Sequence, residues 1–271
     1  MKYNQVMILI LLLIFLFGYC GSEDPSQIRK KKDVVAIIYC DLSTSVDSTS
    51  IYKVADDAQK LLNYFPRGSI LHFYPIDQSP FVSPILEFTK PLLGGTSSEE
   101  AENEMFINMA ASTIYNQIIQ KYRKINSNPK DRNVARSCIL RTLETAHLLF
   151  RQYRIIPNKN YKYELIYLSD MLEECYDSPI GPLFMTKRYH QLAKEKLESY
   201  NPNFDLSYAK ISIINSVDFE KGPSPYIKYE DLKNLWKKIF LKVGFTEEQI
   251  IDFNFSPRIP HRFTEYEKYN L

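Results

Sequence analysis

Three oxygen-bearing side chains stand at alternate positions directly after the first strongly apolar stretch of the folded part of the chain. Asp41, Ser43 and Ser45 form a D-x-S-x-S pattern that follows the run 34–39 (VVAIIY). One carboxylate and two hydroxyls on the same side of a loop supply the hard oxygen ligands that Mg²⁺ prefers. The pattern forms a metal site only if other loops converge on it.

Two other loops are expected to converge on this one. Ser137 opens a helical stretch, and Asp170 follows the apolar run 163–168 (YELIYL). In an open parallel sheet, ligands bind beyond the carboxyl ends of the strands, and loops from different strands meet there. A site at this edge of the sheet would therefore draw on three separate parts of the sequence.

The elements that must position these loops alternate along the chain. Short β-branched runs and amphipathic stretches follow one another from residue 32, a pattern typical of an α/β domain with a largely parallel sheet. Expected strands are 34–39, 69–75, 84–89, 163–168, 208–214 and 250–255, and expected helices are 51–65, 99–124, 137–153, 186–200 and 230–243. Prolines beside 84–89 favour an edge position. We predict a doubly wound, mostly parallel sheet with helices on both faces and one antiparallel edge strand.

In its motifs and order of elements the chain resembles the von Willebrand factor A (vWA) domain, over roughly residues 34–255. The metal-ion-dependent adhesion site (MIDAS) of that family uses D-x-S-x-S, a Thr that opens a later helix, and an Asp after the fourth strand. The resemblance implies a vWA or Rossmann-like fold and a site for Mg²⁺ or another divalent cation. The implied ligands are Asp41, Ser43, Ser45, Ser137 and Asp170.

The ligand assignment has alternatives. Ser137 stands where the family has Thr, and Thr96 in the run Gly94-Gly95-Thr96 also resembles the Thr loop. Ser137 is preferred because its helix leads directly into the strand that ends at Asp170. A structural interpretation is that the D-x-S-x-S side chains only cap the following helix, which Asp and Ser do well. A vWA fold whose metal site has degenerated is a further alternative.

The implied function is protein binding. Two carboxylates and neutral hydroxyls leave a bound cation incompletely neutralised, so an acidic side chain of a protein partner can complete its coordination. No catalytic base or activated nucleophile is recognisable nearby, so we do not expect an enzyme. One alternative is a scaffold without metal. Another is a phosphohydrolase of the haloacid dehalogenase type, with Asp41 as nucleophile; that chemistry needs a carboxylic acid at position 43, where Ser43 stands.

Composition excludes several other classes. The 271 residues include 34 Lys and Arg and 32 Asp and Glu, so the net charge of +2 gives no basic excess for nucleic acid. The 8 glycines do not form a dinucleotide fingerprint, a P-loop or a nucleophile elbow. Phosphate-cradling loops and a nucleic-acid partner are therefore not expected.

The first residues have the character of an export signal. Lys2 precedes the apolar run 6–17, which is short for a bilayer span and typical of a signal peptide. Cys20, which follows it, resembles the acylated Cys of bacterial lipoproteins, although Tyr19 departs from their small residue. We predict a signal peptide at 1–19, a lipidated Cys and tether at 20–32, and a vWA-like domain at 33–271. The product is expected in the cell envelope, lipid-anchored to a bacterial membrane facing the periplasm or cell surface. The alternatives are an ordinary secreted protein and an uncleaved N-terminal anchor.

Three further cysteines lie next to the proposed metal loops. Cys40 precedes Asp41, whereas Cys138 and Cys175 follow Ser137 and Asp170. In an oxidising compartment, a disulfide between Cys138 and Cys175 would tie two of these loops together. The alternative is that both are buried, unreacted thiols.

Overall fold

The computed structural model describes residues 33–43, 46, 48–76, 83–92, 94–128, 136–182, 187–214 and 229–250. All of them belong to one compact unit, Asp33–Leu271. The predicted signal peptide, Cys20 and the tether lie outside the described residues, as does Ser45. The predictions about them therefore stay predictions.

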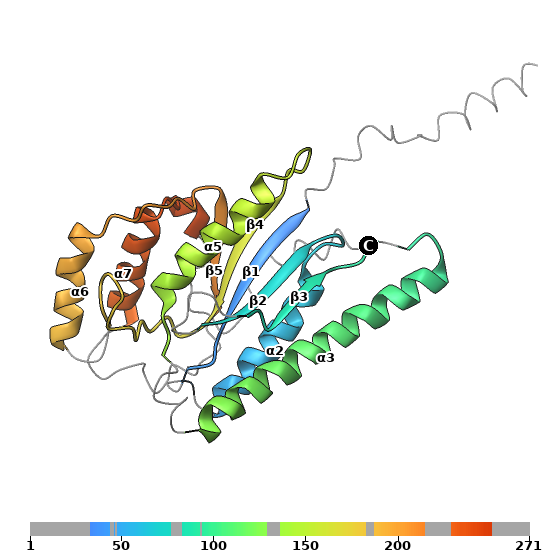
Figure 1. The fold of residues 1–271 in the computed structure, drawn as a ribbon, viewed down its shortest axis with the longest axis horizontal. Helices are drawn as coiled ribbons and strands as arrows, with labels where there is room; N and C mark the ends of the chain where they lie inside the picture. Colours follow the sequence, from blue (N-terminus) through green and yellow to red (C-terminus); the bar gives the residue numbers. More distant parts are fainter. Residues whose placement is uncertain are drawn as a thin grey trace, which may run out of the picture. The chain divides into compact units, whose positions relative to one another are not determined.

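Five strands form one sheet in the order β3-β2-β1-β4-β5 (Figure 1). The strands are β1 Val34–Asp41, β2 Ile70–Ile76, β3 Leu86–Thr89, β4 Lys162–Leu168 and β5 Ala209–Ile214. β1 pairs in parallel with β2 and β4, and β4 pairs in parallel with β5, whereas β3 runs antiparallel to β2. The predicted fold class is confirmed: an α/β sheet, mostly parallel, with one antiparallel edge strand.

β1 lies in the middle of the sheet because its side chains are apolar on both faces. All its residues are buried. Val35, Ile37 and Tyr39 enter one core, and Ala36 and Ile38 enter the other. Alternate side chains of a strand point to opposite faces, so a continuous apolar run requires cover on both sides.

The helices supply that cover. They are α2 Ser48–Tyr64, α3 Ser97–Ser127, α5 Ile139–Arg154, α6 Lys187–Ser199 and α7 Tyr229–Lys242. α2 and α3 pack in the core on one face, and α5 and α7 pack in the core on the other (Figure 1). None of the helices in the described part of the chain has the length and apolar character needed to cross a membrane.

The end of the domain differs from the sequence prediction where it is described. A strand was expected at 250–255, but Ile250 ends a 3-10 helix, Glu247–Ile250, which lies against β5. The short stretch begins with two glutamates and has no alternation of apolar and polar residues before Ile250. Residues 251–255 lie outside the described residues.

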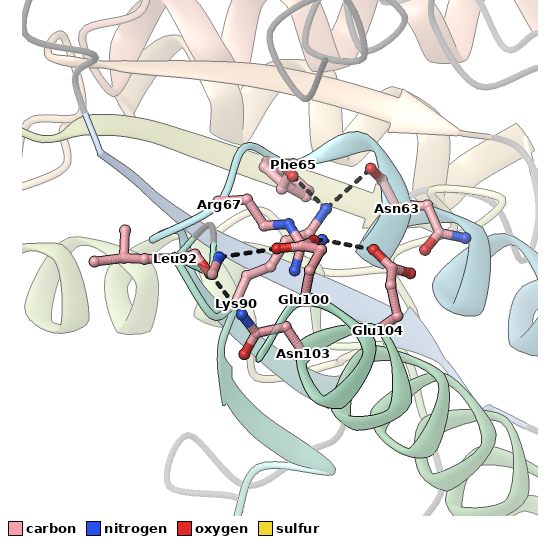
Figure 2. Close-up of polar contacts among 9 residues, drawn as sticks. Asn63, Phe65, Arg67, Lys90, Leu92, Glu100, Asn103 and Glu104 are labelled. Carbon is pink, nitrogen blue, oxygen red and sulfur yellow. Dashed lines mark hydrogen bonds and ion pairs between the residues drawn. The ribbon is translucent and has the colours of Figure 1, made fainter. Parts of the chain in front are cut away.

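Two basic side chains, Lys90 and Arg67, form a cationic clasp that fixes the connection between β3 and α3 (Figure 2). The clasp lies at the end of the sheet where β2 begins. Lys90 is buried, and its Nζ donates to the carbonyl of Phe65 at 2.6 Å, just beyond the end of α2. Arg67 forms ion pairs with Glu100 and Glu104 of α3. Cations stabilise the exposed carbonyls at a helix C-terminus, so the clasp joins α2 to α3 at this end.

Candidate metal site

The loops after β1 and β4 meet the start of α5 at one edge of the sheet. β1 and β4 are neighbours, with Cys40 opposite Leu168, so the residues that follow them emerge side by side. The Oγ of Ser137 donates to the two carboxylate oxygens of Asp41, at 2.9 and 3.1 Å. The three predicted loops therefore converge on Asp41.

Asp41 is fully buried and is held by hydrogen bonds from several segments. The backbone N–H of Ser43 donates to its Oδ1 at 3.0 Å. The Oγ of Ser169 donates to its Oδ2 at 2.7 Å. A buried carboxylate is tolerated only where hydrogen bonds or a cation compensate for lost hydration. These donors fix the orientation of the Asp41 carboxylate.

Asp170 is the second buried carboxylate of the site, with 3% of its surface exposed. Its Oδ1 accepts the backbone N–H of Leu172 at 3.0 Å. Burial and the nearby charge of Asp41 raise the pKa of Asp170 well above its usual range. Like charges held close together in a dry environment favour the uptake of a proton or a cation.

The turn after β4 has an unusual backbone at Met171, whose φ is 60°. A residue other than glycine in the left-handed region needs surrounding contacts to hold it there. The N–H of Met171 donates to the Oγ of Ser169 at 2.9 Å, and its carbonyl accepts the indole N–H of Trp236 at 2.8 Å. Trp236 thus links the core of α7 to the turn that carries Asp170.

Ser169 belongs to the site although the sequence analysis did not select it. It is fully buried and bridges Asp41 to the backbone of the β4 turn. The register of β1 against β4 predicts its position. Once β1 and β4 are taken as parallel neighbours, the residue after Leu168 must face the residue after Cys40.

The loop of Ser137 is fastened to the loop after β4. A disulfide joins Cys138 to Cys175, with a Cα–Cα distance of 5.2 Å, which is the pairing considered from the sequence. The N–H of Ser137 donates to the carboxylate of Glu174 at 2.9 Å, and the N–H of Glu174 donates to the carbonyl of Ser137 at 2.8 Å. The position of the Ser137 hydroxyl is therefore set by the same loop that carries Asp170.

Glu173 is a further buried carboxylate that the sequence analysis missed. Its Oε2 accepts the N–H of Leu140 at 2.8 Å, in the first turn of α5, where Cys138 offers no side-chain cap. Its Oε1 accepts the N–H of Cys175 at 3.3 Å. Burial raises the pKa of Glu173 to about 8, against the opposing effect of these N–H donors. Glu173 caps α5 from a distant loop, which no local pattern reveals.

We expect Glu173 to make the stability of the protein fall as the pH rises. A carboxyl whose pKa is raised on folding contributes stability below its unfolded pKa, near 4.5, and loses it as the pH passes through about 8. Glu173→Gln keeps the size and one acceptor oxygen but cannot ionise. The free energy of unfolding in urea, measured from about pH 5 to 8.5, should therefore decline less steeply in this variant.

Asp170 contributes to the same decline, because its pKa is also raised, so part of the decline should remain in Glu173→Gln. The exposed Glu195 on α6 provides the control, and Glu195→Gln should follow the wild-type curve. Parallel curves for Glu173→Gln and the wild type would show that Glu173 is ionised throughout this range.

The remaining candidate ligands differ in their placement. Ser43 is buried beside Asp41, but Ser45 lies outside the described residues. Thr96 begins α3 beside the cationic clasp, where its Oγ1 accepts the N–H of Glu99 in a capping box. Asp41 pairs with Ile76 at the other end of β2. The structure thus brings Ser137 to Asp41 and gives Thr96 a helix-capping role elsewhere.

The donor set around Asp41 fits a hard divalent cation. Two buried carboxylates and several hydroxyls offer oxygen ligands of the kind that Mg²⁺ takes. The described part of the chain holds a second group of potential ligands, Cys138, Glu173 and Cys175. Their sulfur and carboxylate oxygen atoms all lie within 4.8 Å of one another. Their two sulfurs are bonded to each other, so this second group offers no thiolate to a metal.

In comparisons with known proteins, no family model matches the chain, and no curated protein shows significant similarity to it. The proposed function therefore rests on the geometry of the site.

Proposed function

We propose that this chain is a metal-dependent protein-binding module of the vWA type. The observation that carries the proposal is the convergence of Asp41, Ser137 and Asp170, which lie far apart in the sequence, at the carboxyl end of neighbouring parallel strands. This is the edge at which open α/β sheets bind ligands. The resemblance of the D-x-S-x-S pattern to a MIDAS motif points to the same residues.

The residues that would hold Mg²⁺ are Asp41, Ser43, Ser45, Ser137 and Asp170. When bound, the cation would supply a Lewis-acidic position for an oxygen of an acidic partner group. The protein prepares this position. Ser169 orients the Asp41 carboxylate, and Glu174 holds the backbone of Ser137. Burial of both carboxylates keeps water away and strengthens their attraction for a cation.

A metal-free scaffold is the second candidate, and one observation favours it. Both oxygens of Asp41 accept hydrogen bonds from within the protein, so the carboxylate is compensated by the fold itself. In that case Asp41 would serve as a structural hub for three loops. Metal titration distinguishes the two candidates directly.

We also propose that the domain is held at the cell envelope by a lipid on Cys20. The support is the sequence of the first residues: the apolar run 6–17, followed by Cys20 and a polar stretch. Several acyl chains on one Cys give far more stable membrane binding than a single chain.

The test is a titration of the purified protein with Mg²⁺, with and without a short aspartate-containing peptide. We expect the peptide to bind only when Mg²⁺ is present, and Asp170→Asn to lose this binding. Asp177→Asn is the matched control, because Asp177 is an exposed carboxylate paired with Arg141. Peptide binding that persists in EDTA would contradict the metal site, and Mg²⁺-dependent hydrolysis of a phosphate monoester would favour the phosphohydrolase.

A further inference from the structure

The segment that runs from the last residue of α5 to the first residue of β4, residues 154–162, has an apolar tip. Ile155 and Ile156 are consecutive, and 74% and 38% of their surfaces are exposed. Neither is placed in the two cores of the domain. Two adjacent isoleucines on an exposed turn form an apolar projection. Moving this projection from water into another apolar environment would lower the free energy.

The surroundings of this tip are cationic. Arg151, Arg154, Lys159 and Lys162 are all exposed, and the stretch 151–162 (RQYRIIPNKNYK) contains no carboxylate. Two acidic groups from neighbouring segments face these cations. The Oδ2 of Asp33 accepts from the Nζ of Lys159 at 3.1 Å, and a hydrogen bond from a nearby hydroxyl and the charge of Arg154 help to lower the pKa of Asp205. The four basic side chains outnumber these two carboxylates, and the excess of positive charge is complementary to anionic lipid headgroups.

Aromatic side chains support the loop from below. Tyr153 and Tyr161 are half-buried, with their ring centroids 5.9 Å apart, and the guanidinium of Arg154 lies 4.1 Å above the ring of Tyr208. Tyrosine is enriched at the level of lipid headgroups, because its ring is apolar and its hydroxyl is polar. Tyr153 packs against the core, where its hydroxyl lies 2.6 Å from the Nε2 of His72, so Tyr161 is the tyrosine that would meet headgroups. An apolar tip with cations and a tyrosine beside it has the composition of a segment that contacts a membrane surface.

The loop lies at the end of the sheet where the chain enters the domain (Figure 1). Val34 pairs with Lys162, and the N–H of Lys162 donates to the carbonyl of Asp33 at 2.9 Å. A chain anchored through Cys20 reaches this same end after a tether of only 21–32, which itself ends in the basic run RKKK. The anchor would therefore join the membrane to the end of the domain that carries this loop.

We propose that residues 154–162 rest on a bilayer that contains anionic lipid, with Ile155 and Ile156 at the depth of the headgroups. This inference rests on the lipid anchor proposed above. Asp41 lies at the opposite end of β1, which spans about 25 Å at the usual rise per residue. The candidate metal site is then presented away from the membrane, toward a partner.

The experiment uses the full chain, produced in a bacterium that lipidates exported proteins and then mixed with vesicles with and without phosphatidylglycerol. An environment-sensitive fluorophore is attached to Ile155→Cys, and quenching by a nitroxide-labelled lipid is measured. The control carries the label at Tyr52→Cys, an exposed position on α2 near the other end of β1. Native thiols do not interfere, since Cys40 is buried and Cys138 is disulfide-bonded.

We expect the label at position 155 to be quenched several times more than the label at 52, and less so without phosphatidylglycerol or at high salt. If the chain floats with the vesicles but the two labels are quenched equally, the membrane-facing loop is wrong while the anchor stands. If the chain does not float with the vesicles, both the anchor and this inference are wrong.

Discussion

Mg²⁺ is expected to raise the thermal unfolding temperature of the wild-type protein and to leave that of Asp41→Asn unchanged. A ligand that binds only the folded state stabilises it by about 2.7 kcal/mol at a hundredfold excess over its dissociation constant. For a domain of this size, that corresponds to a rise of about 5 to 10 °C. Asp41 accepts the hydrogen bonds that join three loops, so removing its charge should remove the cation as well.

Asparagine is the informative replacement because it keeps the size of the side chain and still bonds to hydroxyls on Ser137 and Ser169. It also removes the charge that contributes to the raised pKa of Asp170. The pKa of Asp170 should therefore move back toward its usual value, and the metal-free variant should remain folded. Asp56→Asn, on the exposed face of α2, serves as control and should respond to Mg²⁺ like the wild type. An equal response in Asp41→Asn would exclude Asp41 as a ligand.

The sheet was predictable from the sequence because its signals are local. The continuous apolar run of β1 requires two covered faces and therefore a central position. The prolines beside residues 84–89 placed β3 at an edge, where the structure has it. Amphipathic spacing located α2 and α5, whose buried residues face opposite cores.

The details of the site were less predictable because they depend on contacts between distant segments. Ser169 reaches Asp41 through the register of β1 against β4. Glu173 and Glu174 lie in the loop after β4 and accept backbone N–H groups at and just before the start of α5. Nothing in the run MLEEC marks them as caps. The start of α3 does carry a local signal, since Thr96 and Glu99 have the spacing of a capping box. The helix was nevertheless expected only from residue 99, and Thr96 was considered only as an alternative ligand.

Removing the disulfide is expected to lower the free energy of unfolding by about 2 to 4 kcal/mol. Cys138 and Cys175 are separated by 37 residues, and a cross-link over that distance restricts the unfolded chain considerably. The change is the double replacement Cys138→Ser and Cys175→Ser, measured by urea unfolding. Wild-type protein treated with a dithiol reductant should unfold at the same urea concentration as the double variant. Cys40→Ala, which leaves the cross-link intact, should lose as much as the wild type on reduction.

The same cross-link should also raise the affinity of the site for Mg²⁺, because it connects the loop of Ser137 to the loop of Asp170. The backbone bonds between Ser137 and Glu174 remain after reduction, so the two loops stay adjacent but are held by fewer constraints. A site whose ligands are less fixed loses affinity, since the cation must then order them on binding. We therefore expect weaker Mg²⁺ binding by the double variant in calorimetric titration at a temperature where it is fully folded. Unchanged affinity there would mean that Glu173 and Glu174 alone position the loops, with the disulfide acting only on the unfolded chain.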